Sequence, residues 1–166
     1  MKRFLPTSIL LATLTAGLLA ADLSADSSAL SAHVSFLTAL DPPRSVYHLS
    51  SLDSASSYIE KQFRRLSGNV EIRQHRVSHG SVRNLILSFG PESGPRVIVG
   101  AHYDVAGNQP GADDNASGIA GLLELARMLS QVSDKLTKRI DLVAYTLEEP
   151  PFFRTEYMGA SSMLSR

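Results

Sequence analysis

The decisive fold pattern lies in residues 96–147, which read RVIVGAHYDVAGNQPGADDNASGIAGLLELARMLSQVSDKLTKRIDLVAYTL. Residues 96–101 form a nearly continuous apolar run, which is typical of a strand covered on both faces. Residues 116–131 carry apolar side chains at helical spacing, and residues 140–147 again have the pattern of a buried strand. A strand, a helix and a strand in this order favour a right-handed parallel unit. The stretch predicts an α/β protein: a three-layer sandwich with a mostly parallel central sheet and helices on both faces.

Four further elements are expected before this unit. Helical spacing of apolar residues predicts helices at residues 29–40 and 52–66. Strand patterns follow at residues 70–77 and 82–89, and a Gly-Pro pair ends the second. We therefore expect residues 26–166 to belong to a single domain.

Composition excludes several classes of function. Lysine plus arginine and aspartate plus glutamate both number 16, so the net charge is near zero and gives no footprint for nucleic acid. The chain has no cysteine, which rules out thiol catalysis and cysteine zinc sites. Any transition-metal site must be built from histidine, aspartate and glutamate.

The N-terminus has the pattern of an export signal. Lys2 and Arg3 precede an apolar stretch at residues 9–21, which is too short to span a bilayer comfortably. We predict a signal peptide over residues 1–25, cleaved near residues 20–25, and a secreted or periplasmic protein that is free of the membrane after cleavage. An uncleaved membrane anchor is the alternative.

Polar residues gather in three short segments, each placed at the end of a predicted strand or the start of a helix. They are His-Tyr-Asp at residues 102–104, GADDNASG at residues 111–118 and Glu-Glu at residues 148–149. Each has an ordinary reading alone, as a surface pair, a helix cap or a polar strand end. In parallel sheets, however, ligands gather beyond the carboxyl ends of the strands, where these segments lie.

A calcium loop is a competing interpretation of the middle segment, because five residues match the spacing of an EF-hand. They are Asp113, Asn115, Ser117, Gly118 and Glu124. That motif requires a helix directly before the loop, and residues 105–111 are rich in glycine and proline. The helical pattern also predicts Glu124 on the solvent side, so we reject calcium.

Taken together and in this order, the three segments resemble the di-zinc aminopeptidase family of the MH clan (peptidase family M28). The family also includes some carboxypeptidases and glutaminyl cyclases. The similar stretch runs from about residue 84 to about residue 159, roughly half of the chain, and its middle motif is highly diagnostic.

The resemblance implies a role for each polar residue. His102 would bind one zinc ion, and Asp104 would orient its ring. Asp114 would bridge two zinc ions, and Glu149 would bind the second. Glu148 would act as general base toward the attacking water. The implied activity is removal of N-terminal amino acids from peptide substrates.

The resemblance also implies two further ligands, a carboxylate and a second histidine, later in such chains. Because this sequence ends at Arg166, we expect an N-terminal portion with an uncovered sheet edge and little activity of its own. The alternatives are a non-catalytic exported module with at most a weak metal site, and a relative of the glutaminyl cyclases. The sequence does not indicate an oligomeric state.

Overall fold

The structure is a computed structural model that describes residues 23–66, 68–77 and 80–161. The predicted signal peptide lies almost entirely outside the described residues, so that prediction stays untested. Within the described ranges, no helix is long and apolar enough to cross a membrane.

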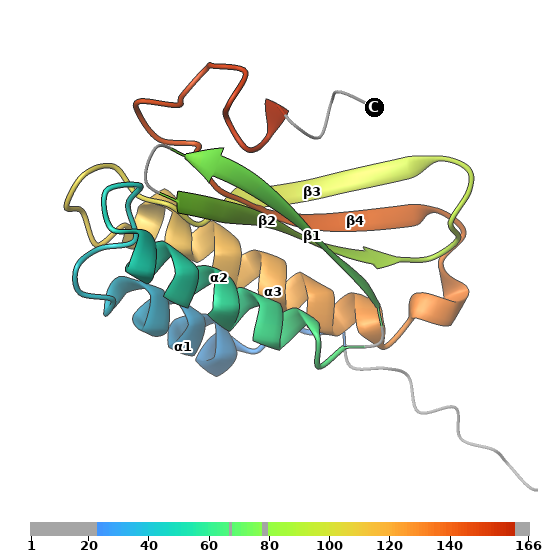
Figure 1. Cartoon of the computed structure of the whole chain (residues 1–166). Coiled ribbons are helices and arrows are strands. Elements are labelled where there is room, and N and C mark those ends of the chain that lie inside the picture. Colours follow the sequence, from blue (N-terminus) through green and yellow to red (C-terminus); the bar gives the residue numbers. More distant parts are fainter. Residues whose placement is uncertain (1–22, 67, 78–79, 162–166) are drawn as a thin grey trace, which may run out of the picture.

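The sheet has four strands in the order β1-β2-β4-β3 (Figure 1). These are β1 (Asn69–Val77), β2 (Gly80–Phe89), β4 (Arg139–Tyr145) and β3 (Arg96–His102). β3 and β4 are parallel, whereas β2 is antiparallel to both β1 and β4. The α/β class is confirmed, but a mostly parallel sheet is not, since one of the three pairings is parallel. For β1 and β2 the reason is local, because they are too close in sequence for the crossover that a parallel pair requires. The antiparallel pairing of β2 with β4 joins strands that are far apart in the sequence.

The three long helices are α1 (Ser27–Thr38), α2 (Leu49–Phe63) and α3 (Ser117–Ser130). All three lie on one face of the sheet, and the chain beyond β4 passes over the other side (Figure 1). The described part therefore has one helix layer and one sheet, and the helices expected on the second face are not among the described elements. The predicted parallel unit is confirmed, with α3 connecting β3 to β4.

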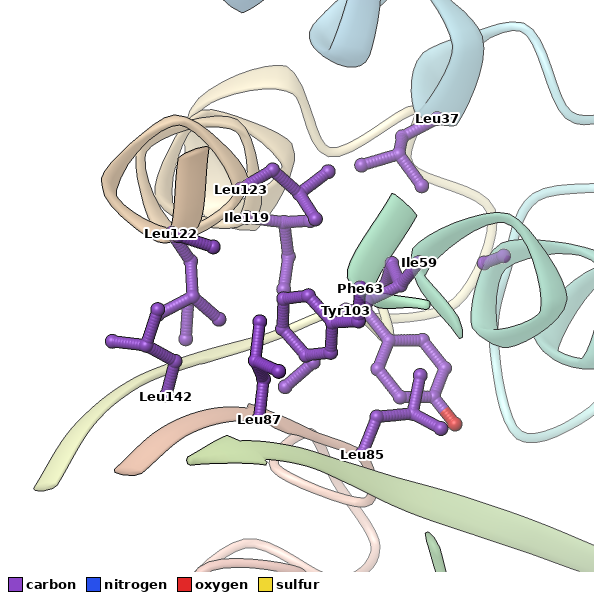
Figure 2. Close-up of a cluster of buried hydrophobic side chains, with 14 of the residues drawn as sticks. Leu37, Ile59, Phe63, Leu85, Leu87, Tyr103, Ile119, Leu122, Leu123 and Leu142 are labelled. Carbon is purple, nitrogen blue, oxygen red and sulfur yellow. The ribbon is translucent and has the colours of Figure 1, made fainter. Parts of the chain in front are cut away.

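The main core lies between the helices and the sheet (Figure 2). Leu85 and Leu87 of β2 point into it, whereas Ile86 belongs to a small cluster on the opposite face with Val143. This alternation follows from the two-residue period of a strand. The core is completed by fully buried side chains from the helices and the neighbouring strands: Leu37, Ile59, Phe63, Ile119, Leu123 and Leu142.

β3 is an edge strand, with β4 as its single partner among the described residues. Val97, Ile98 and Val99 are 45%, 41% and 36% exposed. The prediction that this run is covered on both faces is therefore wrong for the described part. The prediction of an uncovered apolar edge is confirmed there.

Candidate metal centre

The carboxyl ends of β3 and β4 bring two of the predicted segments together. His102, the last residue of β3, pairs with Tyr145 at the end of β4. The alignment continues one residue further, because the Tyr103 amide donates to the Tyr145 carbonyl at 2.9 Å. Glu148 and Glu149 follow within four residues of that point. The parallel pairing thus places both glutamates beside the histidine.

The ring of His102 is held between acidic groups on two sides. Its Nδ1 lies 3.2 Å from the backbone oxygen of Asp104, which accepts a hydrogen bond when Nδ1 carries the proton. Its Nε2 lies 2.9 Å from Oδ1 of Asp114 and 3.8 Å from Oε2 of Glu148. In that tautomer Nε2 is the ring nitrogen with a free lone pair, and it faces two carboxylates.

Asp104 lies behind the histidine and is almost fully buried, with 2% of its side chain exposed. Its Oδ2 accepts a hydrogen bond from the Glu149 amide at 3.1 Å. Its Oδ1 has no hydrogen-bond partner among the described residues and lies 3.6 Å from His102 Nδ1. One carboxylate therefore contacts both the histidine and the turn that carries the glutamates.

The Asp114 loop is a short, irregular turn at Ala112–Ala116 that leads directly into α3. Gly111 precedes it with a φ of 61°, a left-handed conformation that suits glycine. The Asn115 side chain accepts a hydrogen bond from the Gly118 amide at 3.0 Å, as a helix cap does. The side chain of Asp114 is 75% exposed, so it reaches His102 from the solvent side.

The turn after β4 is fixed by a residue that the sequence analysis did not select. Asn84 is fully buried; its Nδ2 donates to the Gly159 carbonyl at 2.8 Å, and its Oδ1 accepts from the Thr146 amide at 3.0 Å. Leu147 then adopts a φ of 57°, which turns the chain out of the strand. An asparagine in a strand pattern carries no signal for such a role, because the segment that it binds lies 62 or more positions away.

Negative charge dominates the electrostatics of the site. Burial alone would lower the pKa of His102, but contact with Asp104 and the charges of Asp104, Glu148 and Asp114 outweigh it and raise the pKa to about 9. The pKa of Glu149 is raised, first by burial and then by the charge of Asp114. The raised pKa of His102 follows from the carboxylates around it, which favour a positive charge among them.

The donor set suits a zinc ion. His102, Glu148 and Glu149 each offer one ligand atom, and these atoms all lie within 4.8 Å of one another. Imidazole nitrogen and carboxylate oxygen are ordinary zinc ligands. The unpartnered Oδ1 of buried Asp104 adds the carboxylate that commonly supports a ligating histidine. The five residues predicted from the sequence thus lie together: His102, Asp104, Asp114, Glu148 and Glu149. The geometry does not separate the two glutamates, since each offers an oxygen within 4.8 Å of the His102 ligand atom.

Comparisons with known proteins agree with this geometry. Residues 84–165 match Peptidase family M28. The uncharacterized Escherichia coli protein YfbL is 42% identical over 136 residues, which cover 77% of this chain and 42% of that protein. The human BOS complex subunit NCLN is 43% identical over 56 residues, or 31% of this chain and 10% of that protein.

Solved structures share the fold. The glutaminyl cyclase of Porphyromonas gingivalis superposes with a TM-score of 0.62 at 27% identity, over 76% of this chain and 47% of that one. A Zn-dependent exopeptidase from Parabacteroides distasonis gives 0.60 at 26% identity, over 82% and 52%. This chain thus spans about half the length of these proteins or less. Through residues 84–165, which contain the whole of the acidic cluster around His102, the chain belongs to Peptidase family M28.

Proposed function

We propose that this chain carries part of the active site of a zinc-dependent exopeptidase that removes N-terminal amino acids from peptides. The observation that carries the proposal is the cluster at the ends of β3 and β4. There, His102 Nε2 lies 2.9 Å from Asp114, and His102, Glu148 and Glu149 offer ligand atoms within 4.8 Å of one another. The similarity to Zn-dependent exopeptidases supports zinc as the metal.

In the proposed arrangement His102 and Asp114 would hold one zinc ion, and Asp114 and Glu149 would hold a second. Asp104 keeps the proton on Nδ1 of His102 and leaves Nε2 free to bind. When bound, zinc in such a site polarises a carbonyl group and lowers the pKa of a water molecule.

Glu148 is the proposed general base. Its side chain is 31% exposed, so water and substrate can reach it, and its Oε2 points toward His102 Nε2 at 3.8 Å. A carboxylate at this position accepts a proton from the water that attacks the scissile carbonyl. It then gives that proton to the leaving amine, which completes peptide hydrolysis.

The described residues supply only two protein ligands to each proposed ion, whereas catalytic zinc commonly has three and a water. We infer that a further carboxylate and a histidine from outside the described residues complete the site. The 166-residue chain by itself is then expected to bind zinc weakly and to turn over little substrate.

Zinc titration and peptide hydrolysis test the proposal together. The 166-residue chain is titrated with Zn²⁺ against a chromogenic chelator, beside a His102→Ala variant. Hydrolysis of leucine p-nitroanilide is then measured on the longest natural form of the protein that contains this chain. Zinc binding lost in the variant, and hydrolysis lost on chelation, would support the proposal. A chain that binds no zinc in either form would contradict it.

Glutaminyl cyclase activity is the second candidate, because the glutaminyl cyclase of Porphyromonas gingivalis superposes with a TM-score of 0.62 at 27% identity. The two reactions have different products. A cyclase releases ammonia from peptides that begin with glutamine, whereas an aminopeptidase releases a free amino acid from many peptides. Zinc binding with neither product would favour the non-catalytic module.

Export of the protein is also part of the proposal, on the basis of the N-terminal residues 1–25. Mass spectrometry of the mature protein from its native source tests this point directly. We expect the mature chain to begin between residues 21 and 26, and an intact Met1 would contradict export by cleavage.

A further inference from the structure

Arg44 is the largest fully buried side chain among the residues that the structure describes, with 1% exposure, and it lies in the segment between α1 and α2. Its guanidinium donates to three backbone carbonyls. Nη1 donates to Leu37 at 3.0 Å and to Pro110 at 2.6 Å, and Nη2 donates to Gly111 at 2.6 Å. Two of these carbonyls belong to the loop that leads to Asp114. Arg44 therefore fixes the start of the Asp114 loop against the end of α1.

The backbone of Arg44 holds the other side of the site. Its carbonyl accepts a hydrogen bond from the Val105 amide at 3.1 Å. Val105 directly follows Asp104, the carboxylate behind His102. A single residue thus contacts the segment that carries His102 and Asp104 as well as the segment that carries Asp114.

The loop packs closely against this arginine. A Cβ atom at Gly111 would lie 2.9 Å from Arg44 Nη2 and 2.6 Å from the Asp114 carbonyl, and it would collide with Val105. The Gly111 carbonyl also accepts from the Ala116 amide at 3.0 Å, where α3 begins. Gly111 is therefore bound from one side by Arg44 and from the other by the helix start.

The charge of Arg44 suits the same location. Among the described residues it forms no ion pair, and its Nε has no hydrogen-bond partner. Burial lowers the pKa of Arg44 to about 10, against the charges of Asp104 and Asp114, which favour the protonated form. The guanidinium is therefore charged at neutral pH, and the charges of Asp104 and Asp114 favour that form.

We propose that Arg44 is a positioning residue for the metal centre, which holds the Asp114 loop at the distance from His102 that shared metal binding requires. The inference rests on the proposed function. It depends on the shape of arginine, because the planar guanidinium donates to carbonyls in fixed directions, whereas lysine is a compact point charge on a flexible stem. Charge alone does not fix the loop.

Hydrogen exchange on the metal-free 166-residue chain tests the positioning without reference to zinc. Two reporters, called the loop amides below, are the amide of Ala116 in the loop and the amide of Gly118 in the first turn of α3, which donates to the loop residue Asn115. The third reporter is the amide of Leu142 in the core. Arg44→Lys is expected to lower protection of the two loop amides by about tenfold or more, because hydrogen bonds to charged groups are worth that much. Protection of Leu142 is expected to stay unchanged, which separates a local effect from general loss of stability.

Arg83→Lys is the matched control. Arg83 also donates to several oxygens, those of Asp53, Ser56, Ser57 and Glu60 on α2. It binds α2 to the sheet, and its side chain makes no hydrogen bond or ion pair with the Asp114 loop among the described residues. The same chemical change there is expected to leave the loop amides unchanged.

Titration with Zn²⁺ and the absorption spectrum of bound Co²⁺ give the second readout. Arg44→Lys and Arg44→Met are both expected to weaken Zn²⁺ affinity by about 10- to 100-fold, the usual effect of removing support behind a ligand, and to alter the Co²⁺ spectrum. Wild-type loop protection and affinity in folded Arg44→Lys would overturn the proposal. Weakening by Arg44→Met alone would also overturn it, since the role would then be charge.

Two further results have to be provided for: Arg44 variants that do not fold, and a wild-type chain that binds no Zn²⁺. If neither Arg44 variant folds, Gly111→Ala takes their place. Its added methyl group disturbs the contact between Gly111 and the Arg44 guanidinium, and the charge of Arg44 is kept. Unchanged protection and affinity in that variant would overturn the proposal. If the wild-type chain binds no Zn²⁺, the proposed function fails, while the exchange data on the metal-free chain still decide whether Arg44 orders the loop.

Discussion

The carboxylate of Asp104 lies directly behind the ring of His102, with Oδ1 3.6 Å from Nδ1, and its other oxygen accepts from the Glu149 amide. Asp104 is therefore connected to the histidine and to the glutamate turn at the same time. A ligating histidine whose far nitrogen loses such a partner binds metal less tightly.

We expect Asp104→Asn to weaken Zn²⁺ affinity by about 10- to 100-fold. The amide group removes the charge behind His102 and brings a donor group to a site where two donors already converge. Asp113→Asn is the control, since Asp113 is exposed and next to the proposed ligand Asp114. Equal affinity of the two variants in a chelator titration would contradict the role of Asp104.

Substitutions of Glu148 and Glu149 are expected to have different effects, one on hydrolysis and the other on Zn²⁺ affinity. With Glu148→Gln, hydrolysis by the complete protein should fall by about 100- to 10,000-fold, the usual contribution of a general base, while Zn²⁺ affinity is kept. With Glu149→Gln, Zn²⁺ affinity itself should fall. Both glutamates belong to the cluster around His102, so the reverse result would exchange their assignments. Kinetics and zinc titration of both variants decide.

Asn84 is expected to matter for stability although it lies outside the metal cluster. Asn84→Ala removes two buried hydrogen bonds and leaves the Thr146 amide and the Gly159 carbonyl without that partner. The expected cost is about 2–4 kcal/mol in the free energy of unfolding. Asn108→Ala, in the exposed loop after β3, should change it little. Urea unfolding of both variants makes the comparison.

The pH dependence of stability in the metal-free chain should report on His102. Its pKa is raised from 6.5 to about 9 in the folded chain. Its contribution is therefore fully present below pH 6.5 and is lost as the pH rises through about 9. We expect about 1–2 kcal/mol after allowance for solvent screening.

Urea unfolding at pH 6 and pH 10, in the presence of a chelator, measures this contribution. Other groups also titrate in that range, so the informative quantity is the difference between the wild type and His102→Gln. That difference should shrink from pH 6 to pH 10. A constant difference would show that the charge of His102 does not stabilise the fold.

The edge at β3 should govern self-association of the 166-residue chain. Val97, Ile98 and Val99 are exposed on an edge strand whose outer backbone groups pair with no other strand of the described residues. Such an edge is a template for pairing with another chain. We expect Ile98→Lys to reduce concentration-dependent association in sedimentation velocity. Tyr47→Lys changes an apolar residue outside the sheet that is more exposed still, at 69% against 41% for Ile98, and it should have no such effect.

The sequence was sufficient for the β3–α3–β4 unit, because periodicity and the position of glycine and proline are local signals. It also predicted the convergence of His102, Asp114 and Glu149, since the carboxyl ends of neighbouring parallel strands meet at one edge. The sheet topology could not be read in the same way. Which strands become neighbours depends on long-range pairing, and β2 proved to be antiparallel to β4.

Burial of polar side chains was the other part that the sequence could not supply. Glu124 was predicted on the solvent side of α3, yet it is buried, where it accepts from the Asp26 amide and pairs with Arg127. That prediction was wrong because the partner, Asp26, lies 98 positions away in the sequence. Arg44 was missed for the same reason, since its partners Pro110 and Gly111 lie 66 and 67 positions away.

The strand order β1-β2-β4-β3 has a consequence for how the protein is made. As the chain leaves the ribosome, β1 and β2 can pair at once, but β3 finds no neighbour until β4 has been synthesised. β4 must then enter between two strands that precede it, which is a non-local and comparatively slow step. During that interval β2 and β3 both present open edges to other nascent chains. A chaperone that covers these edges during the interval should therefore raise the yield of soluble protein.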